Sequence, residues 1–527
     1  MFFSLDFLLV YLPLTLLGFG IIKRVSPLLC PSYLVALLYI SLYFIDTTSF
    51  VLVFTTSSLN YLLVRKIHQE QEQKQKQKAL VVTGVILSLL PLILYKFAGS
   101  LFRDTDLDSS MLFTVGIPIG LSFYALQQVM VIIDCRHKAM TILPYTRHLL
   151  YLGFFPNFIA GPIFQYRKAV EPISTLGYKP IPDDWVGNGL LLFLVGLSKK
   201  LWIANPIGGA IDHIITKIQT PDTGLNIFEA WFVVWGFLVQ LYFDFSAYSD
   251  IAIGLAMCFG ILLPINFDSP LKAYSTQEYI SRWHMSFTGF VREYFFIPIL
   301  GLLKKLPIKN TENKMTIAWA VGLFSSYIII GAWHAPNLVV MTSSTVLILI
   351  LFIIKLPSLL SKQTKKTASN NKIRKHINRC VLLLVAMLTA ICFKTQDIDI
   401  LQKIYISLVS FDNISLPPFM QQILPSFIEK AMSFTGISPL LNDYQTGEHI
   451  FTQTKVFFVT LLIATLIIFL SPNTMTIFGI KNTDNSHSFK LGQGLIFHFL
   501  FIFLFFTTIF VLVFETHQIQ NFIYEKF

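Results

Sequence analysis

The sequence predicts an all-α, polytopic integral membrane protein with roughly 11–16 transmembrane, re-entrant and interfacial helices around a central tunnel. Hydrophobic residues make up 54% of the 527 residues, charged residues only 13%, and the mean hydropathy is +0.64. A soluble protein of this length needs more polar side chains to cover its surface. Many uncharged stretches also approach the length of about 20 residues that a helix needs to cross a bilayer. The composition therefore excludes an ordinary soluble protein.

The apolar tracts supply the expected helices in chain order. Those long enough to span a bilayer are 25–45, 47–64, 111–133, 315–333, 335–354, 456–480 and 491–514. Shorter runs that can cross with tilt, or lie re-entrant against protein, are 7–22, 79–95, 185–198, 230–243, 251–267 and 380–393. The first run lacks a basic region before it and a small-residue cleavage site, so we expect it to be retained.

The net charge of +11 is distributed in short basic blocks between the apolar tracts. Such blocks are typical of cytoplasmic loops, so we interpret the charge as membrane topology and not as nucleic-acid binding. The blocks are Lys23–Arg24, 65–78, 136–147 and 362–379. The acidic segments 104–108 and 397–448 alternate with them and are predicted to lie outside. Counting crossings from the last basic block places the C-terminus outside as well.

His334 is the first candidate for chemistry. It is the only residue between Lys314 and Lys355 that can carry a charge near neutral pH, and it follows Trp333 in a long apolar region. A charged side chain at that depth costs roughly 2.5–3.5 kcal/mol or more, so the imidazole is expected to be neutral, and either hydrogen-bonded or facing a wet cavity. The alternative is a packing histidine held by a backbone carbonyl group.

A second histidine, His284, follows a predicted helix start. Ser275 and Glu278 have the spacing of a capping box. Apolar residues then recur at helical spacing: Ile280, Trp283, Phe287, Val291 and Tyr294. His284 falls within this stripe, so its ring is expected to point into the protein. The alternative is an interfacial helix with a structural histidine.

A third polar cluster lies between two apolar runs. Asp244 and Tyr248 are four residues apart, so on a helix a hydrogen bond from the tyrosine would help to neutralise the buried carboxylate. This pair is more typical of a structural role than of a catalytic one. The five cysteines have no C-x-x-C spacing, and no zinc or other metal site is predicted. P-loop, H-E-x-x-H and G-x-S-x-G motifs are also absent, which leaves histidine as the plausible base.

The order of these segments resembles the membrane-bound O-acyltransferase family, in particular its bacterial alginate O-acetyltransferase branch. The segments that carry the resemblance are 117–124, 155–162, 196–200, 242–250, 282–284 and 333–334. The resemblance implies N-terminal transmembrane helices over 1–110, a family core with a catalytic tunnel over 111–480, and a C-terminal helix with an outward-facing tail over 481–527.

The resemblance also implies roles for particular residues. His334 would be the catalytic base, and His284 the second functional histidine. The terminal segment 522–527 resembles the F-x-Y-x-x-F ending of acyl relay subunits, so Tyr524 would accept the acyl group. The alternative for Tyr524 is an aromatic anchor at the membrane surface. Residues implied in the tunnel or in donor binding are Arg282, Trp283, Trp333, Asp244 and Tyr248.

The expected function is transfer of an acetyl group from a cytoplasmic thioester, acetyl-CoA, to an extracytoplasmic polysaccharide or peptidoglycan. The protein would lie in the bacterial cytoplasmic (inner) membrane, among lipids, without a bound cofactor, and would work with an external SGNH-type acetyltransferase. One alternative is D-alanyl transfer to teichoic acids from a carrier protein. Another is a non-enzymatic lipid or polysaccharide transporter whose histidines line a path.

Overall fold

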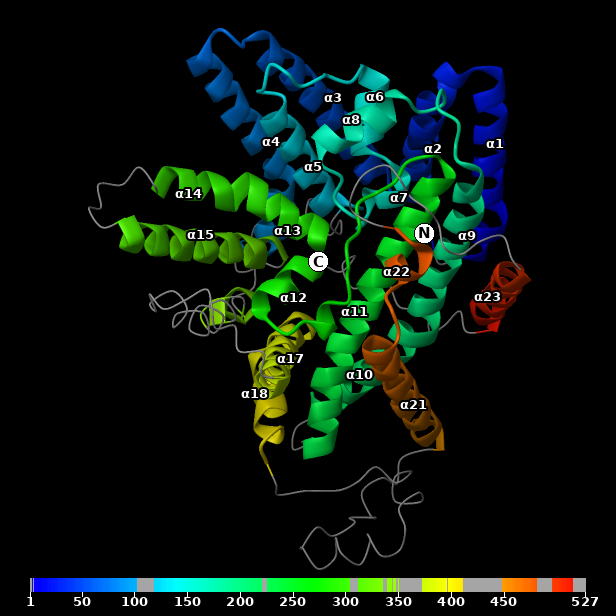
Figure 1. Cartoon of the computed structure of the whole chain (residues 1–527), viewed down its shortest axis with the longest axis vertical. Helices are drawn as coiled ribbons and strands as arrows, with labels where there is room; N and C mark the ends of the chain where they lie inside the picture. Colours follow the sequence, from blue (N-terminus) through cyan, green and yellow to red (C-terminus); the bar gives the residue numbers. More distant parts are fainter. Residues whose placement is uncertain are drawn as a thin grey trace, which may run out of the picture.

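The protein is described by a computed structural model that covers residue 2 and residues 4–101, 118–219, 225–303, 311–334, 339–343, 345–346, 349, 372–395, 397–410, 448–480 and 495–514. Within these ranges every regular element is a helix (Figure 1). In the first half of the chain these are η1 (Phe7–Tyr11), α1 (Leu12–Val25), η2 (Pro27–Leu29), α2 (Cys30–Ile45), α3 (Thr47–Gln69), α4 (Lys74–Leu101), α5 (Leu121–Asp134), α6 (Tyr145–Leu152), α7 (Phe155–Phe158), α8 (Tyr166–Ser174), α9 (Asp183–Ser198), η3 (Lys199–Ala204), α10 (Asn205–Ile218) and α11 (Ile227–Cys258). The second half contains η4 (Pro270–Lys272), α12 (Thr276–Arg282), α13 (Met285–Val291), η5 (Arg292–Phe296), α14 (Ile297–Leu303), α15 (Thr311–His334), α17 (Lys372–Lys394), α18 (Ile398–Ser407), α21 (Glu448–Leu470), α22 (Thr474–Phe478) and α23 (Leu495–Phe514).

Eight of the described helical runs are long and apolar enough to cross a membrane. They are Phe7–Val25, Pro27–Ile45, Thr47–Gln69, Lys74–Lys96, Asp183–Thr216, Ile227–Cys258, Met285–Leu303 and Ile373–Lys394. The prediction of an all-helical, multi-pass membrane protein is therefore confirmed. The total number of crossings stays a prediction, since most of the tract 335–354 lies outside the described residues.

The centre of the molecule is the crossing of α9 and α11, which approach at backbone distance. A methyl group at Gly189 would lie 2.5 Å from the carbonyl oxygen of Gly254, and one at Gly196 would lie 2.7 Å from that of Ala247. In lipid, hydrophobic burial contributes little to helix association, and small residues allow the close packing that stabilises it instead. The two glycines on α9 thus set the spacing of the central pair.

Helix α11 corrects the prediction of two separate short runs over 230–243 and 251–267. It is one helix of 32 residues that continues through the polar cluster between those runs. Its backbone hydrogen bonds stay within the helix, and the polar side chains find partners on other elements, so nothing requires a break there. It begins with a capping box, in which the side chain of Asn226 accepts from the backbone of Glu229.

Two of the basic segments predicted on one side of the membrane lie side by side. The side chain of Lys138 is 3.5 Å from the carboxylate of Glu72, and both are largely exposed. Gln77 Nε2 donates to the backbone carbonyl of Arg136 at 3.1 Å. The α3–α4 turn and the α5–α6 loop therefore meet at one end of the bundle. That this end faces the cytoplasm stays a prediction.

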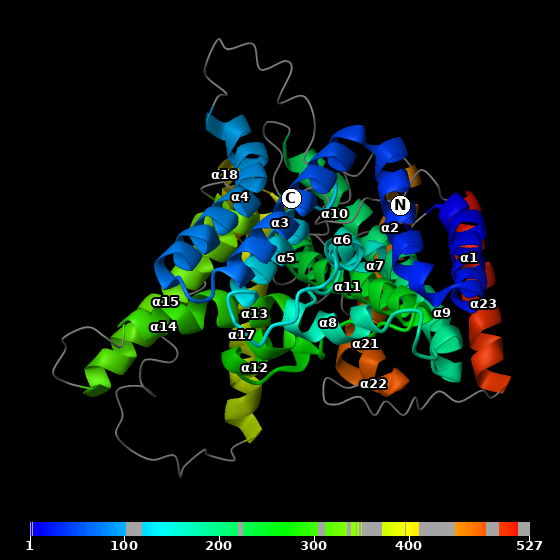
Figure 2. The same ribbon diagram turned by 90° about the horizontal axis from the view of Figure 1, so that it is seen from above.

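Segments distant in the sequence complete the arrangement. Helix α23 lies beside α9 in both views, although nearly 300 positions separate them (Figures 1 and 2). Helices α14 and α15 pack against each other and project from the side of the molecule (Figure 1). The projecting pair leads back to the centre at His334, the last residue of α15.

We predict that Gly254→Ala lowers the melting temperature of the detergent-solubilised protein. The added methyl group would meet the backbone of Gly189 and lie 2.8 Å from the backbone nitrogen of Phe193, so α9 and α11 would have to separate. Overpacking of this kind costs roughly 1–3 kcal/mol. Gly20→Ala on α1 is the matched control, because its methyl group would meet nothing within 4 Å. An unchanged melting temperature for Gly254→Ala would contradict the close crossing.

Candidate active site

His334 lies in the last turn of α15 and is enclosed by aromatic rings. Its side chain is buried, and its ring centre lies 4.7 Å from that of Trp333, 5.2 Å from Phe393 on α17 and 6.2 Å from Phe287 on α13. Three separate helices therefore meet at this imidazole. An apolar setting of this kind favours the neutral, basic form of a histidine.

Lys96 on α4 holds the backbone at His334. Its buried ammonium group donates to the carbonyl oxygen of Trp333 and, at 3.2 Å, to that of His334. It also lies 5.5 Å from the Trp333 ring centre. Carbonyl groups in the last turn of a helix lack intrahelical donors and carry partial negative charge, so a cation is stabilising there. Lys96 thus ties the N-terminal helices to the candidate base.

His284 does not lie within a continuous helix, which corrects the sequence prediction. Helix α12 begins as predicted, with the Ser275 side chain accepting from the backbone N–H of Glu278 at 3.3 Å. It ends at Arg282, and α13 begins at Met285. His284 between them has a φ of 44°, the left-handed region that non-glycine residues rarely adopt. Strain of this kind clusters at functional sites.

Asn266 is the reason for this break. Its backbone carbonyl accepts from the N–H of Met285 at 2.8 Å. Its side-chain Oδ1 accepts from the Ser286 hydroxyl at 2.9 Å and lies 2.9 Å from Nδ1 of His284. These contacts satisfy the start of α13 from a loop 18 positions upstream. The local pattern favours a helix through His284, but the loop contacts override it.

The two histidines are brought together by a single phenylalanine. The Phe287 ring lies 5.0 Å from His284 and 6.2 Å from His334, measured between ring centres, and it stacks on Trp333 at 4.7 Å. His284 is itself buried, with 3% of its surface exposed. The structure therefore places both predicted histidines in one aromatic cluster, although 50 positions separate them in the sequence.

Trp283 and Arg282 lie at the edge of this cluster. The Trp283 ring contacts Phe267 at 5.3 Å and stacks on Tyr279 at 5.7 Å, and Arg282 pairs with Glu278 at 2.7 Å on the same helix. The arginine side chain is partly exposed. Trp333 lies inside the cluster. Of the residues predicted for the tunnel or donor binding, Trp333 is thus in direct contact with the candidate base.

Asp244 has a partner that the sequence analysis did not identify. Its carboxylate lies 2.5 Å from the ammonium group of Lys200 on η3, and both side chains are almost completely buried. The carboxylate is therefore paired with a cation from another helix. Tyr248 packs against the ring of Phe2, with 5.7 Å between the ring centres. Asp244 and Tyr248 therefore connect the central helix α11 to η3 and to the N-terminus.

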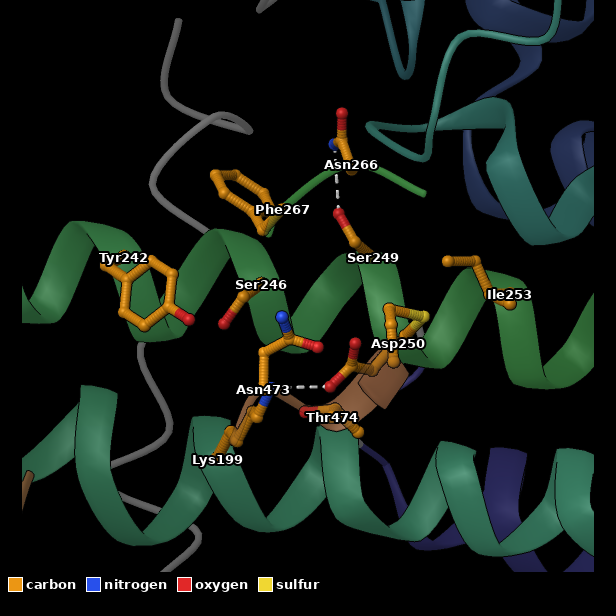
Figure 3. A pocket seen from close by; sticks show the side chains of 11 residues that line it. Lys199, Tyr242, Ser246, Ser249, Asp250, Ile253, Asn266, Phe267, Asn473 and Thr474 are labelled. Carbon is orange, nitrogen blue, oxygen red and sulfur yellow. Dashed lines mark hydrogen bonds and ion pairs between the residues drawn. The ribbon is translucent and has the colours of Figure 1, made fainter. Parts of the chain in front are cut away.

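A polar cavity adjoins the cluster between α11 and the start of α22 (Figure 3). Its volume is about 10 Å³, close to the space that one water molecule needs, and it is partly open to solvent. Lys199 pairs with Asp250 across it at 2.6 Å, and Asn266 donates to Ser249 at 3.0 Å on its wall (Figure 3). Asn266 thus faces both the cavity and His284. The tunnel predicted around His334 stays a prediction.

The remaining points concern Tyr524, metal binding and the two site residues that the sequence did not predict. Tyr524 lies outside the described residues. No cluster of three or more histidine, cysteine, aspartate or glutamate side chains that could hold a metal occurs in the described part of the chain. Sequence reasoning missed Asn266 and Lys96. Lys96 had a signal, a lysine directly after the apolar run 79–95, whereas nothing in the pattern marked Asn266.

Comparisons of the sequence with known proteins identify a family and several relatives. The family model of membrane-bound O-acyltransferases matches residues 32–352. A peptidoglycan O-acetyltransferase of Helicobacter pylori is 27% identical over 362 residues, which cover 63% of this chain and 66% of that protein. A probable alginate O-acetylase, AlgI, of Pseudomonas putida is 33% identical over 264 residues, or 48% of this chain and 52% of that protein. A teichoic acid D-alanyltransferase of Bacillus subtilis is 28% identical over 225 residues, or 42% and 55%.

The chain thus spans between half and two thirds of the length of the curated relatives it matches. The matched family region contains both His284 and His334, and it covers more than half of the chain. The resemblance seen in the sequence is confirmed: this protein belongs to the membrane-bound O-acyltransferase family, in the branch similar to alginate O-acetylases.

Proposed function

We propose that this protein is an O-acyltransferase that moves an acetyl group from acetyl-CoA in the cytoplasm to an extracytoplasmic polysaccharide or peptidoglycan. The observation that carries the proposal is the pair of buried imidazoles, His284 and His334, joined through Phe287 in a chain of this family. Burying two titratable rings at membrane depth is energetically costly, and such residues usually mark functional sites.

His334 acts as the general base. Its neutral imidazole takes the proton of the acceptor hydroxyl, the oxygen attacks the thioester carbonyl carbon, and a tetrahedral intermediate forms. The carbon–sulfur bond then breaks, and the imidazolium returns the proton to the thiolate. Atoms and charges balance without ATP or a redox partner. Lys96 supports this role by fixing the backbone of the last turn of α15.

His284 supplies a second polar group beside the reacting atoms. Trp333 provides an apolar surface inside the cluster, and Trp283 provides one at its edge. Arg282 is partly exposed, where it suits the charged part of a donor thioester. Asp244 and Tyr248 act indirectly, through the packing of α11 against η3 and the N-terminus. These roles complete a site that needs neither a metal nor a bound cofactor.

The acetyl group leaves the protein on the outer side of the bacterial cytoplasmic membrane. Tyr524 takes it from the site as a phenyl ester, and an external SGNH-type acetyltransferase transfers it to the polymer. This relay is supported by the resemblance of the ending 522–527 to the F-x-Y-x-x-F motif and by the predicted topology, which puts the C-terminus outside. Membrane lipids surround the exposed apolar faces of the helices.

Transfer of D-alanine from a carrier protein is the second candidate. The match to the Bacillus subtilis teichoic acid D-alanyltransferase favours it, but that match covers less of this chain than the match to the Helicobacter pylori protein does. A transporter without enzymatic activity would require neither histidine as a base. The first experiment below separates both alternatives from the proposal.

We predict that His334→Ala lowers acetyl transfer or hydrolysis of acetyl-CoA by the purified protein roughly 100- to 10,000-fold, the range for loss of a general base. Release of labelled acetate or free thiol measures the rate. His213→Ala on α10 is the matched control, because His213 is exposed and lies outside the cluster. Undiminished turnover in His334→Ala would rule out the assigned base, and activity only with a D-alanyl carrier thioester would favour the second candidate.

We also predict that Tyr524→Phe abolishes acetylation of the polymer in cells, because phenylalanine has no oxygen to carry the acyl group. Mass spectrometry of the C-terminal peptide should detect the acetyl ester in the wild type. The ester should be absent in His334→Ala. Tyr178→Phe, at an exposed tyrosine, is the control. Wild-type polymer acetylation in Tyr524→Phe would exclude the relay and leave direct transfer.

A further inference from the structure

The proton positions around His284 can be deduced from its neighbours. Its Nδ1 lies 2.9 Å from a side-chain atom of Asn266. An asparagine side chain has an oxygen that only accepts and a nitrogen that only donates. Which of the two faces His284 decides which ring nitrogen carries the proton, and therefore what the other nitrogen can do.

The orientation of the Asn266 amide is fixed by a backbone donor. The N–H of Ser286 points at the same side-chain atom, at 3.3 Å, and a backbone N–H can only donate. The Ser286 hydroxyl accepts from the N–H of Ile163 at 3.0 Å and so donates its own hydrogen to that atom at 2.9 Å. The atom that faces His284 must therefore be the oxygen, Oδ1.

The other end of the amide agrees with this orientation. Asn266 Nδ2 lies 3.0 Å from the hydroxyl oxygen of Ser249. That hydroxyl donates to the carbonyl of Phe245 at 3.0 Å, one turn earlier on α11, so its oxygen is available as an acceptor. Every hydrogen in the network has one consistent position, and none requires the opposite amide orientation.

It follows that neutral His284 carries its proton on Nδ1 and a lone pair on Nε2. Nε2 is buried and has no hydrogen-bond partner among the residues that the structure describes. Phenylalanine rings surround the imidazole, with ring centres at 4.4 Å for Phe245, 5.0 Å for Phe287 and 6.3 Å for Phe123. A buried acceptor without a donor is energetically unfavourable, which indicates that a ligand supplies the missing donor.

We propose that Asn266 is a positioning residue that locks His284 in the Nδ1–H form, so that Nε2 accepts a hydrogen bond from an N–H or O–H group of the substrate. Neutral His284 then has no hydrogen at Nε2 to donate to the thioester carbonyl. This inference rests on the proposed function for its substrate, but the proton assignment does not. It adds Asn266 to the site, together with the loop that carries it.

The direct test is nitrogen-15 NMR of the detergent-solubilised protein labelled only at histidine Nδ1. A protonated ring nitrogen and a bare one give well-separated signals, and subtraction of the His284→Gln spectrum identifies the His284 signal among the 11 histidines. We expect Nδ1 of His284 to be protonated. A bare Nδ1 in the wild type would overturn the proposal whether or not the protein transfers acyl groups.

Variants at Asn266 test the consequence for catalysis. Asn266→Leu keeps the size but removes the acceptor, so the Nδ1–H preference should be lost and kcat should fall roughly 10- to 100-fold, as for other partners that orient a functional imidazole. Asn188→Leu replaces another buried asparagine, on α9, and is the control for packing. Unchanged tautomer and kcat in a folded Asn266→Leu protein would contradict the role.

Asn266→Asp keeps an oxygen acceptor next to His284 Nδ1. It provides a second test if Asn266→Leu does not fold. A carboxylate beside Nδ1 favours the doubly protonated imidazolium, which has no lone pair at Nε2. Among the described residues, the other titratable groups near this region are His334 across Phe287, the Lys199–Asp250 pair beyond Ser249, and Tyr242, which lines the same cavity. The rate of Asn266→Asp should therefore rise with pH relative to that of the wild type. A constant ratio at all pH values would indicate a purely structural role and refute the proposal.

If the NMR result supports the Nδ1–H form while no acyl thioester is turned over, the proposed function fails and the proton assignment stands. If turnover is present but Nδ1 is bare, the positioning role of Asn266 is wrong and the enzyme assignment is unaffected. The two proposals are therefore tested separately.

Discussion

The structure depends on the neutralisation of buried charge between the central helices. Lys199 and Lys200 on η3 face Asp250 and Asp244 on α11, at 2.6 and 2.5 Å. Each charge alone would be costly inside a bilayer, whereas a close pair with opposite sign is tolerated. The glycine contacts between α9 and α11 bring the two helices near enough for these pairs to form. The polar stretch of α11 can therefore remain helical at membrane depth.

This central pair also carries the candidate site. Ser249 on α11 anchors the amide of Asn266, and Asn266 in turn holds the left-handed turn at His284. The strain at His284 is offset by the hydrogen bonds that Asn266 makes to the first residues of α13. A continuous helix would point the same side chain elsewhere, so the break gives the imidazole its direction toward Phe287.

The second histidine is held from a different part of the chain. Lys96 reaches from α4 to the carbonyl groups at the end of α15, while Phe287 and Phe393 pack on the ring of His334 from α13 and α17. The N-terminal helices thus contribute directly to the setting of the candidate base. A cation at a helix C-terminus needs no carboxylate, which explains how a lysine can be buried here with carbonyl partners.

The sequence alone predicts the helical membrane fold, because the length of each apolar tract and the scarcity of charge leave few other ways to satisfy the backbone in lipid. It also determined the start of α12, since the capping side chain of Ser275 acts within three residues. The ordered motifs identified His284 and His334 through a family resemblance. The packing of the folded chain was needed to establish that α11 is unbroken, that Asp244 pairs with Lys200, and that Asn266 and Lys96 hold the two histidines. These features depend on contacts between residues 18 to 238 positions apart, and no local periodicity records which distant side chain will satisfy a buried polar group.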